Sequence, residues 1–296
     1  MTDLNQTDAG DPTPEPRSPG IPAGGCVVPA EPDARLRERA CELAARLGWP
    51  YTDAADEEKV SLVCSDERLE LRFGAQAPGV DTALRKGGPV SADYTAIDTT
   101  SPAGRSLQGP LLRACGLGGR RSGEIKPTVF DATAGWAEDA WLLAGAGCRV
   151  TACERCRPVA VLVEDGLRRA RAADGALRAT AERITLIEVD GGRALKAIKG
   201  PPDVVYLDPM FSEVRKAAPR NAIKALRWLT GVVPGEAVST ASEDERRLYE
   251  AAMASGAGRV VVKRGRRSPA LGDQPPDFVR PGKGHRFDVY LRRGSD

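Results

Sequence analysis

The chain has 296 residues, of which 41% are hydrophobic and 28% are charged, and its formal net charge at pH 7 is +2. This balance is ordinary for a globular protein, and the length accommodates one large domain or two smaller ones. No apolar run approaches the roughly 20 residues that span a bilayer, and the first residues lack the regions of a secretory signal. We therefore expect a cytoplasmic protein with no membrane partner; the oligomeric state is open, with a monomer favoured.

The N-terminal residues 1–32 are rich in Pro, Gly, Asp and Thr and lack apolar periodicity, which predicts a disordered tail. A helix is expected over Asp33–Leu47, with Asp33 as its N-cap and Gly48 directly after its end.

The next segment contains alternating apolar residues at Ser61–Cys64 and Leu69–Phe73, which predict a β-hairpin. Residues 74–123 are rich in loops, with a short helix expected over Leu111–Leu117. Together these features predict a small N-terminal α+β domain over residues 33–125.

From Lys126 onward the pattern alternates between strands and helices, as in a mostly parallel sheet with crossover helices. Strands are expected at Thr128–Asp131, Arg149–Glu154, Ile184–Val189, Asp203–Leu207 and Arg259–Lys263. Helices are expected at Trp136–Ala146, Pro158–Ala173, Gly192–Ile198, Asn221–Leu229 and Glu243–Ser255. The alternation over Arg286–Leu291 predicts an antiparallel edge strand. Residues 126–296 are therefore predicted to form a Rossmann-like α/β domain.

Acidic residues stand at or just after four successive strand ends: Asp131, Glu154, Asp190 and Asp208. Ligands of open α/β sheets bind outside the carboxyl ends of the strands. The sequence therefore places four carboxylates around one crevice.

The turn after the first strand is built from small residues, among them Ala132 and Gly135, so its backbone can approach a ligand closely. A dinucleotide site needs G-x-G-x-x-G with a pyrophosphate on the helix N-terminus. Here Glu138 and Asp139 open the helix and would repel a pyrophosphate, whereas they tolerate the zwitterionic methionine end of S-adenosylmethionine. The turn predicts S-adenosylmethionine rather than NAD.

Two further acids suit the nucleoside part of that cofactor. Glu154 follows Asp131 by about 20 residues, the spacing at which an acid accepts hydrogen bonds from ribose hydroxyls. Asp190, next to Gly191, suits the adenine amino group, and an N-cap role in the following helix is the alternative.

The tetrapeptide Asp208-Pro209-Met210-Phe211 indicates the methyl acceptor. An exocyclic base nitrogen can donate its N–H to the Asp208 carboxylate and the Pro209 carbonyl, while its ring stacks on Phe211. A strand-ending Asp-Pro turn with two apolar anchors is the structural alternative.

The last part of the chain is locally basic, which suits a polyanion such as RNA. The candidate substrate-binding residues are Lys263, Arg264, Lys283, His285 and Arg286. A solvated strand edge and a salt-bridged hairpin are the alternatives. Cys153 and Cys156 form a lone C-x-x-C, read as a strand-end and a helix-start residue, and no metal site is predicted.

Over about residues 35 to 292 the sequence resembles the RsmJ family, the small-subunit ribosomal RNA guanine-N2 methyltransferases. The matching segments are Leu62–Arg72, Asp131–Gly135, Asp139–Ala140, Gly147–Val150, Glu154–Arg155, Asp165–Leu167, Val205–Phe211, Arg259–Arg264 and Lys283–Tyr290. The resemblance implies a class I methyltransferase fold, S-adenosylmethionine as cofactor, and transfer to N2 of a guanine in 16S ribosomal RNA or the small subunit. The implied cofactor contacts are Glu138, Asp139, Glu154, Arg155, Asp190, Gly191 and Asp208.

Two departures from the family pattern keep other readings open. The family usually has Gly-Leu-Gly-Arg-Asp where this chain has Gly135-Trp-Ala-Glu-Asp139, and its basic segment after the hairpin is replaced here by residues nearly devoid of bases. The alternatives are a diverged, non-catalytic member that binds cofactor or RNA, and an N-methyltransferase acting on DNA, a free nucleotide or a small amine.

Overall fold

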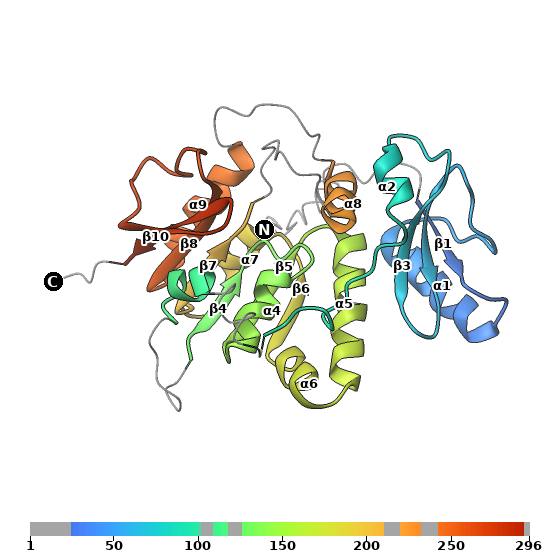
Figure 1. Cartoon of the computed structure of the whole chain (residues 1–296), viewed down its shortest axis with the longest axis horizontal. Helices are drawn as coiled ribbons and strands as arrows, with labels where there is room; N and C mark the ends of the chain where they lie inside the picture. The colour runs from blue at the N-terminus through green and yellow to red at the C-terminus, as the bar shows by residue number, and fades with distance from the viewer. Residues whose placement is uncertain are drawn as a thin grey trace, which may run out of the picture.

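The computed structural model describes residues 25–99, 101, 109–117, 126–209, 220–231 and 242–292. Figure 1 shows a three-stranded N-terminal unit beside a larger seven-stranded sheet, with helix α5 (Arg157–Ala172) between them. Within these ranges no helix is both long and apolar enough to cross a bilayer.

The N-terminal unit is a small sheet covered by one helix. Its elements are β1 (Gly25–Pro29), α1 (Ala34–Leu47), β2 (Val60–Cys64), β3 (Leu69–Phe73) and the short α2 (Thr82–Lys86). The predicted helix is confirmed: Asp33 caps it by accepting from the N–H groups of Arg35 and Leu36, and Gly48 ends it in the left-handed region at φ 66°. The β2–β3 hairpin is confirmed too.

The predicted tail over residues 1–32 is wrong at its end, because Gly25–Pro29 is strand β1 and pairs in parallel with β2. All five residues of β1 are buried. The strand that pairs with β1 is β2, which lies beyond α1 in the sequence. The short apolar run of β1 therefore did not by itself predict a strand. Residues 1–24 lie outside the described residues.

The large sheet has the strand order β6-β5-β4-β7-β8-β10-β9. Its strands are β4 (Thr128–Asp131), β5 (Arg149–Glu154), β6 (Ile184–Glu188), β7 (Val204–Leu207), β8 (Arg259–Gly265), β9 (Phe278–Pro281) and β10 (His285–Leu291). The first five in the order run parallel, as predicted. The predicted edge position of Arg286–Leu291 is wrong, because β9 pairs with the outer side of β10 and forms the edge itself.

Helices cover both faces of this sheet. They are α4 (Glu138–Gly145), α5, α6 (Gly175–Ala181), α7 (Gly191–Ala197), α8 (Asn221–Thr230) and α9 (Glu243–Ala254). The five predicted helices are present with shifted ends, α6 was not predicted, and residues 109–114 form the expected short helix. Leu195 of α7 and Tyr249 of α9 pack with one set of strand residues, and Trp141 of α4 packs with the other.

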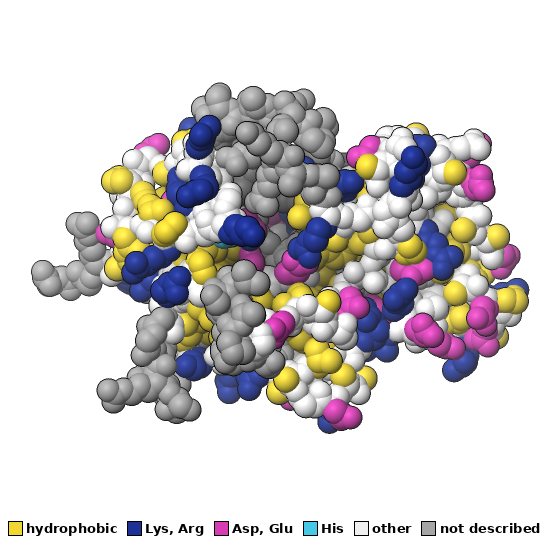
Figure 2. Space-filling view, viewed as in Figure 1, with side chains coloured by type: hydrophobic (Ala, Val, Ile, Leu, Met, Phe, Trp, Pro, Cys, Tyr) yellow, Lys and Arg dark blue, Asp and Glu magenta, His cyan; other side chains and the backbone are white. Residues whose placement is uncertain are grey.

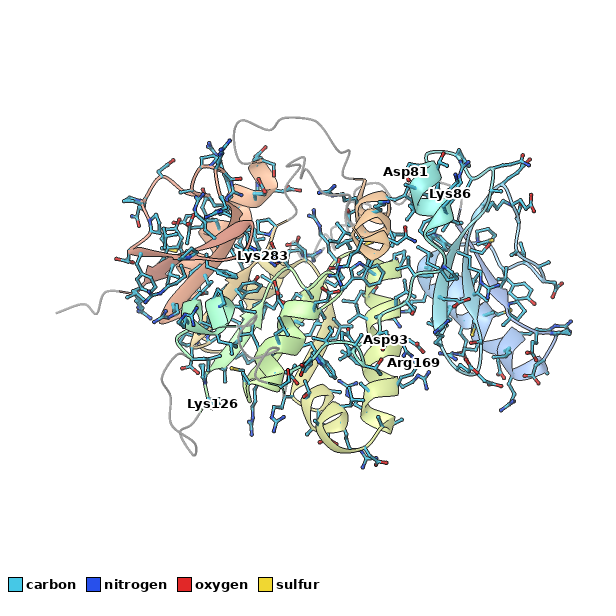
Figure 3. The ribbon with its side chains drawn as sticks, in the orientation of Figure 1. Asp81, Lys86, Asp93, Lys126, Arg169 and Lys283 are labelled. Carbon is cyan, nitrogen blue, oxygen red and sulfur yellow. The ribbon has the colours of Figure 1, made fainter. Side chains whose placement is uncertain are left out.

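The N-terminal unit docks onto α5 through Asp165, which is 3% exposed. Its carboxylate accepts from the Arg39 side chain of α1 at 3.1 Å and from the Leu69 N–H of β3 at 3.1 Å. Arg169, one turn further along α5, also bonds Asp165, and it lies at this junction with Asp93 (Figure 3). The expected domain boundary at residue 125 falls outside the described residues.

Strand order reverses at β4, which has β5 on one side and β7 on the other. Such a reversal opens a crevice outside the carboxyl ends of the two strands. Asp131 ends β4 and Asp208 follows β7, so both face this crevice from adjacent strands.

Candidate functional site

The turn between β4 and α4 is held in an unusual backbone conformation. Gly135 has φ 51° and Ala137 has φ 56°, and Ala137 is the only non-glycine residue with positive φ in the described part of the chain. This conformation costs an alanine about 1–2 kcal/mol. Ala137 is nevertheless fully buried, so packing holds it in place. Such strain is concentrated at ligand-binding turns.

Glu154 at the end of β5 holds the β4–α4 turn, which we call the cofactor turn, by a hydrogen bond to its backbone. Its carboxylate accepts from the Gly135 N–H at 2.8 Å and from the Cys156 N–H at 2.7 Å. Burial raises the pKa of Glu154 to about 7, although the backbone hydrogen bonds partly offset this effect. Each carboxylate oxygen has a second lone pair, so the bonded oxygens can still accept ribose hydroxyls.

Asp131 is more deeply buried, at 1% exposure, and accepts from the Thr133 N–H at 3.0 Å. Burial raises its pKa to about 8. Among the described residues neither Asp131 nor Glu154 has a bonded cation. Buried carboxylates without a bonded cation favour a positively charged ligand. The sulfonium and ammonium groups of S-adenosylmethionine meet this requirement.

Asp190 adopts the N-cap role that the sequence offered as its alternative. Its Oδ1 accepts from the Arg193 N–H at 3.0 Å, while Arg155 lies 3.6 Å from its Oδ2. The adjacent Gly191 packs so tightly that a Cβ there would lie 2.1 Å from the Ala132 carbonyl oxygen. The turns after β4 and β6 therefore meet, which brings Asp190 and Arg155 to the rim of the same crevice.

Asp208 belongs to a charged network at the ends of β7 and β8. Lys263 donates to Asp208 Oδ2 at 2.8 Å and to Asp139 Oδ2 at 2.7 Å. The Tyr206 hydroxyl donates to the same Asp139 oxygen at 2.5 Å. Burial acts to raise the pKa of Asp139, but the charge and hydrogen bond of Lys263 outweigh it, so the pKa is lowered.

The described residues include only the first two residues of the tetrapeptide 208–211, which the sequence assigns to the methyl acceptor. The Asp208 N–H donates to the Thr133 hydroxyl at 2.6 Å, which ties it to the turn after β4, and Pro209 is buried. Met210 and Phe211 lie outside the described residues, so the stacking role of Phe211 stays a prediction.

Three of the predicted substrate-binding cations are bonded within the protein instead. Lys263 bridges two carboxylates, and Arg264 is 3% exposed with its Nε donating to the Pro269 carbonyl. Arg286 makes two bonds to Asp288, at 2.7 and 2.9 Å. These three side chains are bonded to internal carboxylates and carbonyls, and their contact with RNA phosphates stays a prediction. For Arg286, the bonds to Asp288 form the salt-bridged hairpin that the sequence offered as the alternative.

Two of the predicted contacts remain at the surface. Lys283, in the β9–β10 turn, is exposed and extends towards the middle of the view in Figure 3. His285 is partly buried, with its ring edge-on to Phe287 at a centroid distance of 4.9 Å.

Sequence reasoning missed the partner of Glu138. Arg220, directly before α8, donates to the Glu138 carboxylate at 2.6 Å, and the Trp136 indole donates to the Ala222 carbonyl at 2.8 Å. The start of α8 is thus joined to the cofactor turn at two points. No local pattern links residues so far apart, and Tyr206 and Thr133 were missed for the same reason.

Comparisons with known proteins identify the family of this chain. A family model described as a putative SAM-dependent methyltransferase matches residues 42–292. Ribosomal RNA small subunit methyltransferase J of Pseudomonas syringae pv. syringae is 34% identical over 262 residues, covering 87% of this chain and 88% of its own length. The protein of that name from Thioalkalivibrio sulfidiphilus is 36% identical, covering 86% and 94%.

A solved structure shares the fold over nearly the whole chain. The SAM-dependent methyltransferase NGO1261 from Neisseria gonorrhoeae is 29% identical, with a TM-score of 0.62, and the match covers 92% of this chain and 97% of that one. The class I fold and the cofactor, S-adenosylmethionine, are therefore as predicted. The chain belongs to the family of ribosomal RNA small subunit methyltransferase J, whose members are SAM-dependent methyltransferases.

Proposed function

We propose that the chain transfers the methyl group of S-adenosylmethionine to the exocyclic N2 of a guanine in small-subunit ribosomal RNA. The names of its relatives supply the substrate class. The observation that carries the proposal is the position of Asp208, beside the cofactor crevice and bonded through its backbone to the cofactor turn.

The chemistry asks for alignment more than for a strong base. The lone pair of N2 is delocalised into the guanine ring, so the site must hold the nitrogen in line with the methyl group. The bound cofactor supplies an activated methyl group. The Asp208 carboxylate and the Pro209 carbonyl accept from the N–H groups and orient the nitrogen. Asp208 is already paired with Lys263, so its assigned role is to orient the nitrogen, and the proton released from N2 passes to water.

The RNA reaches this site across a basic surface. Figure 2 shows Lys and Arg side chains over the side of the molecule that holds β8 and β10. Within residues 259–292 the exposed cations of this region are Arg266, Arg267, Arg280, Lys283 and Arg292. They form a sequence-independent contact with RNA phosphates. A ribosomal RNA substrate also places the reaction in the cytoplasm.

The test is transfer of labelled methyl from S-adenosylmethionine to under-methylated small-subunit RNA or small subunits, followed by nucleoside analysis. The expected product is N2-methylguanine, and it disappears in Asp208→Ala. A prior measurement is whether S-adenosylmethionine, but not NAD, raises the melting temperature.

The alternatives are separate outcomes of the same assay. Label in DNA or in a small amine, but not in RNA, would replace the proposed substrate. Cofactor binding without transfer to any acceptor would favour the non-catalytic reading, for which the anionic Glu138 at the cofactor turn is the specific reason.

A further inference from the structure

The side chain of Lys263 joins two carboxylates that serve different parts of the reaction. Asp139, on α4, stands at the cofactor turn, and Asp208, after β7, stands at the acceptor position. Lys263 reaches both from the end of β8, with one ammonium group 2.7 and 2.8 Å from the two oxygens. It is 18% exposed, so solvent screens these pairs weakly.

On its buried side the network of Lys263, Asp139 and Asp208 ends at the hydroxyl of Tyr206. The Tyr206 hydroxyl donates to the Asp139 oxygen that also bonds Lys263, so two donors converge on that atom. Tyr206 is fully buried on β7, the strand that leads directly into Asp208. The positions of Asp139 and Asp208 are therefore coupled through one cation and one rigid strand.

We propose that Lys263 is a positioning residue that fixes Asp208 relative to the cofactor turn, by pairing it with Asp139 through a single ammonium group. The inference rests on the proposed function, because it takes Asp208 as the group that orients the methyl acceptor. In this role the effect of Lys263 on the reaction passes through the two carboxylates that its ammonium group bonds.

Loss of the Lys263 ammonium group should separate Asp139 and Asp208. Two carboxylates that shared one cation then repel each other, which rotates Asp208 and weakens the alignment of the acceptor nitrogen. The pKa of Asp139 also rises, because the charge of Lys263 is what holds it down against burial. The other titratable groups that act on this network are Tyr206, Asp131 and His285.

The experiment compares Lys263→Gln and Lys263→Arg with the wild type. Gln keeps two N–H donors and removes the charge, whereas Arg keeps the charge and can bridge two carboxylates. Lys199→Gln is the matched control, because this exposed lysine lies with Thr128 at the opposite end of β4. Circular dichroism and thermal unfolding establish that each variant is folded.

We expect Lys263→Gln to lower kcat by about 10- to 100-fold, the effect of displacing a reacting group by about an ångström. KM for RNA stays within about twofold, and Lys263→Arg recovers most of kcat. The acidic limb of the kcat profile moves to higher pH in Lys263→Gln. Calorimetric titration shows weaker S-adenosylmethionine binding in the same variant, with the loss growing as pH falls.

Two results would overturn the inference. One is an active wild type whose kcat and pH profile are unchanged in Lys263→Gln, which would leave the proposed function standing. The other is a wild type that methylates no RNA, together with unchanged cofactor binding and pH dependence in the variant. A third result separates the two proposals. The wild type methylates no RNA, but Lys263→Gln binds S-adenosylmethionine more weakly and shows the shifted pH dependence. In that case the proposed function fails, and the coupling of Asp139 and Asp208 through Lys263 stands.

Discussion

The buried carboxylate of Asp165 is expected to hold the N-terminal unit against the methyltransferase sheet, and Asp165→Ala tests this directly. In addition to its bonds with Arg39 and the Leu69 N–H, the carboxylate accepts from Arg168 at 2.8 Å and Arg169 at 2.9 Å. One side chain of α5 therefore satisfies donors from α1, from β3 and from its own helix.

The expected loss follows from what the substitution leaves behind. A buried N–H without an acceptor costs about 1–3 kcal/mol, and removing one partner of a buried ion pair costs about 3–5 kcal/mol. Arg39 and Arg168 are 31% and 52% exposed, so water recovers part of their loss. We therefore expect a decrease of about 3 kcal/mol in the free energy of unfolding. At roughly 2–4 °C per kcal/mol this lowers Tm by about 6–12 °C.

The pH dependence gives an independent check. Burial acts to raise the pKa of Asp165, but its arginine and backbone hydrogen bonds outweigh burial and lower it. A lowered folded-state pKa means that the stabilisation is complete above the unfolded pKa of about 3.9 and is lost as pH falls through the folded value. The stability difference between wild type and Asp165→Ala should therefore shrink below about pH 4.

The assay is urea and thermal unfolding, with Asp174→Ala as the matched control. Asp174 is fully exposed and lies 3.6 Å from Arg178 one helical turn away, so solvent screens the pair and its loss should hardly change stability. Asp165→Asn keeps an acceptor for Leu69 and should fall between the two. A loss in Asp165→Ala no larger than that of the control would refute the reasoning.

The remaining predictions concern the site. Because burial raises the pKa of Glu154 to about 7, its ionised form grows as pH rises through 7, so S-adenosylmethionine should bind more tightly with rising pH. Titration of Glu154→Gln should show weaker binding with less pH dependence; an identical profile would exclude the ribose role. Glu138→Ala should release Arg220 towards the methionine carboxylate and tighten binding a few-fold, whereas weaker binding would mean that Glu138 holds the cofactor's ammonium group. Lys283→Ala should raise KM for RNA and leave Tm unchanged, whereas Arg264→Ala should lower Tm; the reverse pattern would contradict their assigned places.

The parts of the fold that were predicted correctly have signals within the segment itself. Asp33 and Gly48 bound a helix by local capping, and alternating residues on both sides of the turn over residues 65–68 predict the β2–β3 hairpin. Strand β1 lacks such a signal, because its partner β2 lies beyond α1. Strand β9 pairs with the next strand, β10, but it has only four residues and ends in Pro281, so its own pattern does not predict a strand. The acids at the strand ends were found because parallel strands place their carboxyl ends at one edge.

Lys263 and Arg264 show why charge in the sequence did not by itself locate the RNA surface. They are adjacent in β8, and helices cover both faces of its sheet, so Lys263 is 18% exposed and Arg264 is 3% exposed. Alternation sends Lys263 to the face of Asp139, and Arg264 to the opposite face, 3.8 Å from Glu245 of α9. The acids that meet Lys263 are 124 and 55 residues away, so no window of sequence shows them together. In this central strand both cations are therefore partners of carboxylates on neighbouring elements, and the cations proposed to contact RNA are exposed ones such as Lys283.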